Sequence, residues 1–129
     1  VIEVDAAGTY TGDVAVIRAD NVTVRGVGGG RPKVDAAGKA AAGKGIWVQY
    51  GAGLTVENVE FVGATCPDGN GAGIRGQGAG LTVRDCRFVG CENGILGGVG
   101  EVLIEHSVFD TCGPPRTPPA HAAYISEKC

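Results

Sequence analysis

Apolar and polar residues alternate along three similar stretches of the chain, and each stretch skips one position near its middle. The stretches are 54–63 (LTVENVEFVG), 81–90 (LTVRDCRFVG) and 102–111 (VLIEHSVFDT), with an earlier partial copy at 22–27 (VTVRGV). A period of two residues is the signal of a β-strand. Asn58, Asp85 and His106 stand at the skipped positions, and these residue types tolerate a left-handed backbone. Each copy is therefore predicted to form two short strands that meet at a one-residue bend.

A third short apolar segment precedes each of the later pairs of strands. These segments are 45–48 (GIWV), 73–76 (GIRG) and 94–97 (GILG). Repeats of this length, with a constant strand motif and variable loops, are typical of stacked coils. The sequence predicts an all-β fold, specifically a right-handed parallel β-helix, a solenoid of about four to five coils with three short strands in each.

Equivalent positions of neighbouring copies carry complementary side chains. Outward positions alternate in charge in two rows: Arg25, Glu57, Arg84 and Glu105, and then Glu60 and Arg87. Inward positions that we expect to stack are Phe61, Phe88 and Phe109. Opposite charges on adjacent strands stabilise a sheet and fix its register. We interpret these charges as a structural device on a solvated face rather than as general acids and bases.

Length and charge narrow the class of protein. A chain of 129 residues predicts a single domain, 1–129, which could be a fragment of a longer chain because neither end shows a cap. Four prolines in residues 113–120 predict an extended loop. A net charge of −3 argues against a nucleic-acid partner, and the sequence holds no run of 18 apolar residues that would span a membrane. No cofactor is predicted.

Five cysteines could serve a structural role. Cys91 and Cys112 follow equivalent phenylalanines by three residues, and Cys66 follows its phenylalanine by five. These three are predicted to form a column of buried thiols or to include a disulfide, since neighbouring coils lie within disulfide range. Cys86 takes an inward strand position. A metal site is not predicted, because no histidine accompanies the cysteines at ligand spacing.

One outward row has the composition of a sugar-binding groove. Its first members are Trp47, Arg75, Leu96 and Tyr124, and Gln49 and Gln77 lie two positions further along. The candidate carbohydrate-binding residues are Trp47, Gln49, Arg75, Gln77 and Tyr124. If the site is catalytic, Arg75 would neutralise a substrate carboxylate, and His121 or Tyr124 would handle the proton. The structural alternatives are that Trp47 packs under a loop or in an interface and that His121 is a corner residue.

Several motifs give the chain a family resemblance. The combination of AAGTYTGDV, GIWV, LTVENVEFVG, LTVRDCRFVG, ENGILGG, VLIEHSVFD and HAAYIS resembles the bacterial right-handed parallel β-helix repeat proteins of the pectate-lyase-like superfamily. This resemblance implies an exported protein, extracellular or periplasmic. It also implies a polysaccharide lyase, hydrolase or epimerase type of fold. The motifs Asn-Thr-Asp, Asp-Asp, Gly-His-Gly and Asp-Pro-His, which such enzymes use, do not occur in this sequence.

Three functions remain open at this point. The first is an exported module that binds or processes an acidic polysaccharide. The second is a non-catalytic structural module that self-assembles end to end into a fibre or scaffold through its open ends. The third is an inactive fragment of a larger enzyme.

Overall fold

The computed structural model describes residues 1–113 and 121–125 of the chain. Across these residues the protein consists of β-strands and loops, without helices. The first strands are β1 (Ile2–Asp5), β2 (Tyr10–Thr11), β3 (Ala15–Ile17), β4 (Thr23–Val27), β5 (Lys33–Asp35), β6 (Gly45–Gln49) and β7 (Leu54–Glu57). The later strands are β8 (Glu60–Val62), β9 (Ala72–Arg84), β10 (Arg87–Val89), β11 (Asn93–Glu105), β12 (Val108–Asp110) and β13 (His121–Tyr124). The all-β class predicted from the alternation is confirmed.

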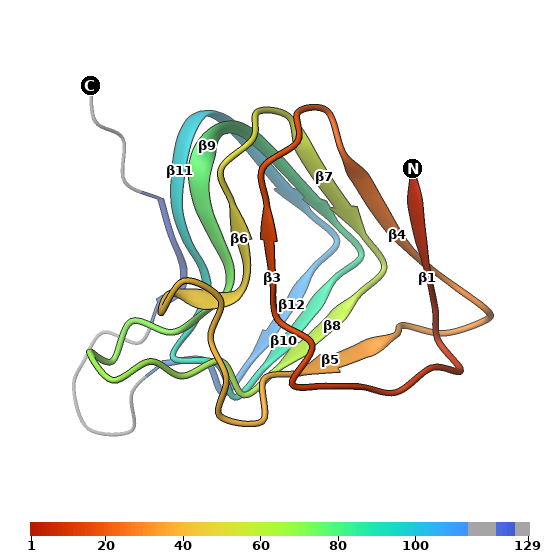
Figure 1. Cartoon of the computed structure of the whole chain (residues 1–129), viewed down its shortest axis with the longest axis horizontal. Coiled ribbons are helices and arrows are strands. Elements are labelled where there is room, and N and C mark those ends of the chain that lie inside the picture. The colour runs from red at the N-terminus through yellow and green to blue at the C-terminus, as the bar shows by residue number, and fades with distance from the viewer. Residues whose placement is uncertain (114–120, 126–129) are drawn as a thin grey trace.

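The strands form two sheets, and the named strands pair in parallel. An eight-stranded sheet has the order β1-β4-β7-β9-β11-β13, with β6 between β3 and β9, and a five-stranded sheet has the order β12-β10-β8-β5-β2. In Figure 1 successive passes of the backbone lie side by side, so that each strand is next to its counterpart from the following repeat. The predicted Pro-rich loop, 113–120, lies outside the described residues except for its first residue.

Two strands are much longer than the sequence predicts. β9 and β11 each run for 13 residues. β9 pairs with β6 through its first half and with β7 through its second half, so one bent strand replaces two predicted short ones. The glycine-rich segment 76–80 makes this continuity feasible, since added Cβ atoms at Gly76 and Gly78 would approach neighbouring backbone.

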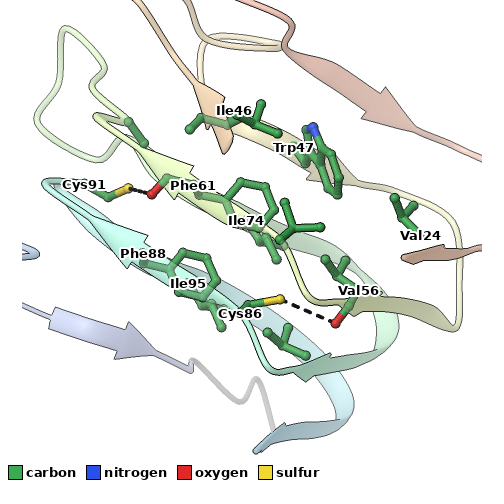
Figure 2. Packing of buried hydrophobic residues seen from close by; sticks show 14 of the residues in the cluster. Val24, Ile46, Trp47, Val56, Phe61, Ile74, Cys86, Phe88, Cys91 and Ile95 are labelled. Carbon is green, nitrogen blue, oxygen red and sulfur yellow. Dashed lines mark hydrogen bonds between the residues drawn. The ribbon is translucent and has the colours of Figure 1, made fainter. Parts of the chain in front are cut away.

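The core is a column of aromatic and aliphatic side chains between the sheets. The rings of Phe61 and Phe88 stack with centroids 5.2 Å apart, and those of Phe88 and Phe109 stack at 4.9 Å. Figure 2 shows Phe61 and Phe88 within the cluster, with Cys86 and Cys91 beside them. The predicted phenylalanine stack and the inward position of Cys86 are therefore confirmed.

The predicted bends adopt the left-handed backbone. The φ angles are 54° at Asn58, 52° at Asp85 and 48° at His106. In β4 the equivalent position is Gly26. A side chain is not tolerated there, because a Cβ would overlap the carbonyl oxygen of Asn58. Asn58 closes this corner, because its Nδ2 donates to the carbonyls of Gly26 at 3.0 Å and Gly30 at 2.9 Å.

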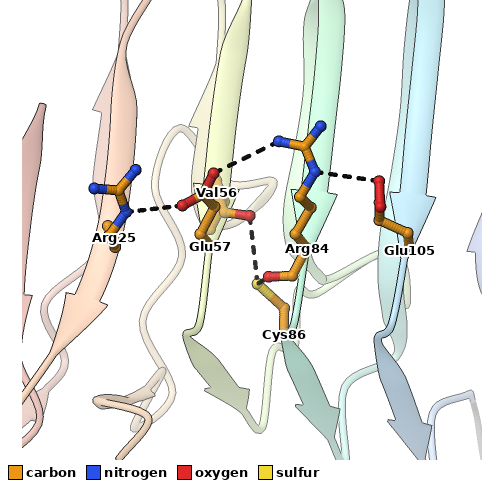
Figure 3. Close-up of polar contacts among 6 residues, drawn as sticks. All are labelled: Arg25, Val56, Glu57, Arg84, Cys86 and Glu105. Atoms are coloured by element: carbon orange, nitrogen blue, oxygen red, sulfur yellow. Dashed lines mark hydrogen bonds and ion pairs between the residues drawn. The ribbon is translucent and has the colours of Figure 1, made fainter. Parts of the chain in front are cut away.

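A ladder of alternating charges crosses β4, β7, β9 and β11, as predicted. Arg25 Nε lies 2.8 Å from Glu57, and Arg84 lies 3.6 Å from Glu57 and 3.2 Å from Glu105 (Figure 3). Glu60 and Arg87, the second predicted pair, lie opposite each other in the register. Their ion pairs, however, are with other residues. Arg87 contacts Asp110 at 3.1 Å, whereas Glu60 contacts Lys33 at 3.9 Å.

Candidate functional site

An outward row of side chains crosses the strands β6, β9, β11 and β13. The register places Val48 next to Arg75, Arg75 next to Leu96, and Leu96 next to Tyr124. Val48 is buried, Arg75 and Leu96 are half-buried, and Tyr124 is 46% exposed. A cation, an aliphatic side chain and an exposed aromatic ring therefore follow one another across three neighbouring strands.

A hollow opens beside this row. It has a volume of about 290 Å³ and is lined by Asn70, Asn93, Leu96 and Tyr124. Two amides and an aromatic ring around a concave surface are suited to a hydroxyl-rich ligand, since amides both donate and accept hydrogen bonds. No carboxylate is among the lining residues found in the described part of the chain.

The loop that supplies Asn70 is fixed by hydrogen bonds from its backbone N–H groups to two carboxylates. The Glu92 carboxylate accepts the N–H groups of Cys66 at 3.0 Å and Gly71 at 2.6 Å. The Asn70 N–H donates to Asp68 Oδ1 at 3.0 Å, which forms a tight turn. Glu92 therefore holds the loop over the row and is itself occupied by backbone donors.

Arg75 supplies the positive charge beside the hollow. Its Nε is buried and lacks a hydrogen-bond partner among the described residues. Within the same residues no carboxylate forms an ion pair with it. A guanidinium whose donors are not already used by the protein is available to a ligand oxyanion.

Two of the predicted binding residues face the wrong way. Trp47 is buried, lies in register with Ile74 rather than Arg75, and packs edge-on against Phe61 at 4.9 Å. The prediction of an outward Trp47 is therefore wrong, because the alignment of β6 slips by one residue and the slip reverses its face. Gln49 is also fully buried, and its Nε2 donates to the carbonyls of Gly51 at 2.9 Å and Gly80 at 2.8 Å.

The remaining predicted residues divide between the row and other places. Arg75 and Tyr124 flank Leu96 in the row. Gln77 is half-buried in β9 and does not line the hollow. The backbone of His121 is in register with Asn93, and its side chain lies outside the described residues. Asn70 and Asn93 line the hollow although neither was among the predicted binding residues, and their place there depends on loop geometry.

The cysteines form a pair rather than a column of three. All four described cysteines are free thiols. Cys91 and Cys112 occupy equivalent positions two residues after β10 and β12, with the Gly113 N–H donating to the Cys91 carbonyl at 2.8 Å, and their thiols interact. Ala64 takes the next position in that column, since Glu92 N–H bonds its carbonyl at 2.9 Å. Cys66 lies in the following loop instead.

The two thiols differ in acidity. A hydrogen bond from Cys91 lowers the pKa of Cys112 to about 7, although burial acts in the opposite direction. The same hydrogen bond, together with burial, raises the pKa of Cys91. Burial raises the pKa of Cys86 to about 11, so this thiol stays protonated and packs as an apolar side chain.

The described part of the chain holds no group of three or more His, Cys, Asp or Glu side chains arranged to bind a metal ion. None of its segments is a helix of the length and apolarity needed to cross a membrane. Comparisons with protein-family models, curated proteins and solved structures find no match to this chain.

Proposed function

We propose that this chain is a right-handed parallel β-helix from an exported protein and that it binds an acidic polysaccharide along the row Arg75–Leu96–Tyr124. The parallel pairing of successive repeats in two sheets supports the solenoid. The observation that carries the binding function is the hollow beside Arg75, a cation without an ion-pair partner among the described residues.

The residues that line the hollow, together with Arg75 beside Leu96, match the parts of a uronate residue. The Arg75 guanidinium can form two parallel hydrogen bonds with a carboxylate. Asn70 and Asn93 offer amide donors and acceptors to ring hydroxyls, and the Tyr124 ring offers an apolar face to the pyranose. The row runs across successive strands, about 4.8 Å apart, so an extended polymer lying on it would contact several repeats.

Binding is proposed rather than bond cleavage. A glycosidase needs two carboxyl groups on either side of the scissile bond. The described residues that line the hollow include none. Glu92, the nearest acidic residue in sequence to Asn93, already accepts two backbone N–H groups.

Titration calorimetry with an oligogalacturonate tests this proposal. Its control ligand is the same oligosaccharide with the carboxyl groups reduced. We expect wild-type protein to bind the acidic form, and Arg75→Gln to weaken that binding roughly ten- to hundredfold through loss of a charged hydrogen-bond donor. Tyr124→Ala should weaken it as well, while Tyr124→Phe should retain most of it.

Arg18→Gln is the matched control variant. It removes the same charge from an arginine that lies over the Tyr50 ring at 4.8 Å; neither residue lines the hollow. If Arg18→Gln and Arg75→Gln weaken binding of the acidic oligosaccharide equally, the protein attracts it only through its net charge. Equal binding of the acidic and reduced oligosaccharides would contradict recognition of a carboxylate.

A further inference from the structure

Arg75 is the single charged side chain of its row in the described part of the chain. Each residue of the row lies in register with the next, in the order Val16, Val48, Arg75, Leu96 and Tyr124. Apolar side chains therefore flank the arginine on both adjacent strands. Gln77, two positions further along β9 and so on the same face, is uncharged as well. The row offers a ligand one cation with uncharged neighbours.

Both asparagines that line the hollow stand close to carboxylates. Asp68 Oδ1 accepts the N–H of Asn70 at 3.0 Å. Glu92 directly precedes Asn93 in the chain, and its carboxylate accepts the N–H of Gly71 at 2.6 Å. Two negative charges therefore hold the backbone on this side of the hollow, whereas Arg75 supplies one positive charge from the row.

The Cys66 thiol reports the balance of charge around this loop. Burial is the main reason why the pKa of Cys66 is raised above its ordinary value. The negative charges of Asp68 and Glu92 raise this pKa further. The positive charges of Arg75 and Lys44 lower it, but each acts more weakly than either carboxylate. The carboxylates therefore outweigh the cations here, and Lys44 does not line the hollow.

We propose that the ligand of this row is a polysaccharide with spaced charges, in which the uronate that meets Arg75 is flanked by uncharged sugars. This inference rests on the proposed binding function and narrows its substrate class. Adjacent strands lie about 4.8 Å apart, which is similar to the length of one sugar in an extended chain. The sugars next to the bound uronate therefore lie over the adjacent strands, toward Val48 on one side and Leu96 on the other.

A carboxylate on a neighbouring sugar would lose water without gaining a cation. Leu96 offers it an aliphatic surface, and removing a charge from water is costly unless an opposite charge replaces the water. On the loop side it would approach Asp68 and Glu92, and like charges that are partly shielded from solvent are screened less by salt. An uncharged sugar avoids both costs, because Asn70 and Asn93 can bond to its hydroxyls.

Three tetrasaccharides with one backbone test the spacing of charge. The first is fully acidic tetragalacturonate, the second alternates uronate with carboxyl-reduced residues, and the third is fully reduced. Titration calorimetry at one ionic strength gives the affinity of each for the full chain. We expect the alternating compound to bind about three- to tenfold more tightly than the fully acidic one, and the fully reduced compound to bind most weakly.

A second cation in the row should reverse this preference. Leu96→Lys places a positive charge on the strand next to Arg75, so the fully acidic compound should then bind at least as tightly as the alternating one. Leu96→Gln is the neutral control and should keep the preference of the wild type. Circular dichroism checks that both variants are folded.

Removing a negative charge from the loop should act in the same direction. Asp68→Asn keeps an oxygen that can accept the Asn70 N–H, and it should raise the affinity for the fully acidic compound roughly two- to fivefold. Asp35→Asn is the matched control, because Asp35 accepts the Ala37 N–H at 2.8 Å in the same kind of turn and does not line the hollow. This control should leave the affinity unchanged.

The outcomes separate this inference from the proposed function. If the fully acidic compound binds most tightly to wild-type protein and Arg75→Gln weakens that binding, the row binds acidic polysaccharide but the spacing of charge is wrong. An unchanged preference in folded Leu96→Lys would also overturn the inference. If none of the three compounds binds, or if Arg75→Gln changes nothing, both the inference and the proposed function fail.

Discussion

Trp47 packs against Phe61 with ring centroids 4.9 Å apart and ring planes at 88°. The two residues come from β6 and β8, which belong to different sheets. Their edge-to-face contact joins the first-strand segments to the phenylalanine stack in the core (Figure 2). The single tryptophan of this chain is therefore a structural residue that joins the sheets.

Trp47→Ala should destabilise the protein without removing a ligand contact. Truncating a buried aromatic side chain costs about 3–5 kcal/mol, and Trp47 is 7% exposed. Urea unfolding followed by circular dichroism measures the loss. Oligogalacturonate affinity, measured under conditions where the variant is folded, should match that of wild type. A folded Trp47→Ala variant with much weaker binding would place the ring in the site after all.

Gly73→Ala should strain the core next to the phenylalanine stack. A Cβ at Gly73 would lie 2.6 Å from a ring carbon of Phe88 and 2.9 Å from the Gly94 carbonyl oxygen. Phe88 is held between two stacked rings, so relief would require backbone movement. We expect a loss of about 1–3 kcal/mol in the free energy of unfolding. Gly30→Ala is the control, because its Cβ would meet only Ala6 at 3.8 Å.

Arg84→Gln should weaken the charge ladder in a salt-dependent way. Arg84 lies between Glu57 at 3.6 Å and Glu105 at 3.2 Å, and its side chain is 40% exposed. Partly exposed pairs in a network contribute roughly 0.5–1 kcal/mol, and salt screens them. Thermal unfolding should show a lower Tm for the variant at low salt and a smaller difference in about 1 M NaCl. Lys39→Gln, an exposed lysine without an ion pair in the described residues, should show neither effect.

Cys112 should be the most reactive of the described thiols near neutral pH. Its pKa is lowered to about 7 by the hydrogen bond from Cys91, so thiolate forms, and alkylation accelerates, as the pH rises through 7. Cys91→Ala removes that donor and should raise the pKa of Cys112, which would slow its alkylation at pH 7.5 by about tenfold. Site-resolved mass spectrometry after a brief iodoacetamide pulse gives the rate. Cys86→Ala should leave that rate unchanged, and a similar slowing there would mean that the hydrogen bond is not the cause.

The register of the main repeats could be predicted because three independent signals agree on it. Alternating charges, the position of the bend and the phenylalanine in each copy all fix the same alignment. The structure confirms it, with Phe61 in register with Phe88 and Phe88 with Phe109. Because the local pattern and the cross-strand pairs favour the same alignment, a shift of the strand register is disfavoured.

The alignment of the first-strand segments could not be predicted in the same way. A Gly-Ile dipeptide is the shared signal there, and it fits two alignments that differ by one residue. In the structure Gly45 pairs with Ala72 rather than with Gly73, which turns Trp47 into the core. The hollow was also beyond sequence reasoning, because Glu92 positions the loop bearing Asn70 through two backbone hydrogen bonds.

Nitrogen-15 NMR titration of the labelled protein with an oligogalacturonate tests the proposed site most directly. Ligand-dependent shifts are predicted to concentrate at the backbone amides of Asn70, Arg75, Asn93, Leu96 and Tyr124, and to disappear in Arg75→Gln. The row Thr23, Thr55 and Thr82, on β4, β7 and the second half of β9, should remain unchanged. Shifts confined to that row, or no shifts at millimolar ligand, would contradict acidic polysaccharide binding at the Arg75 row.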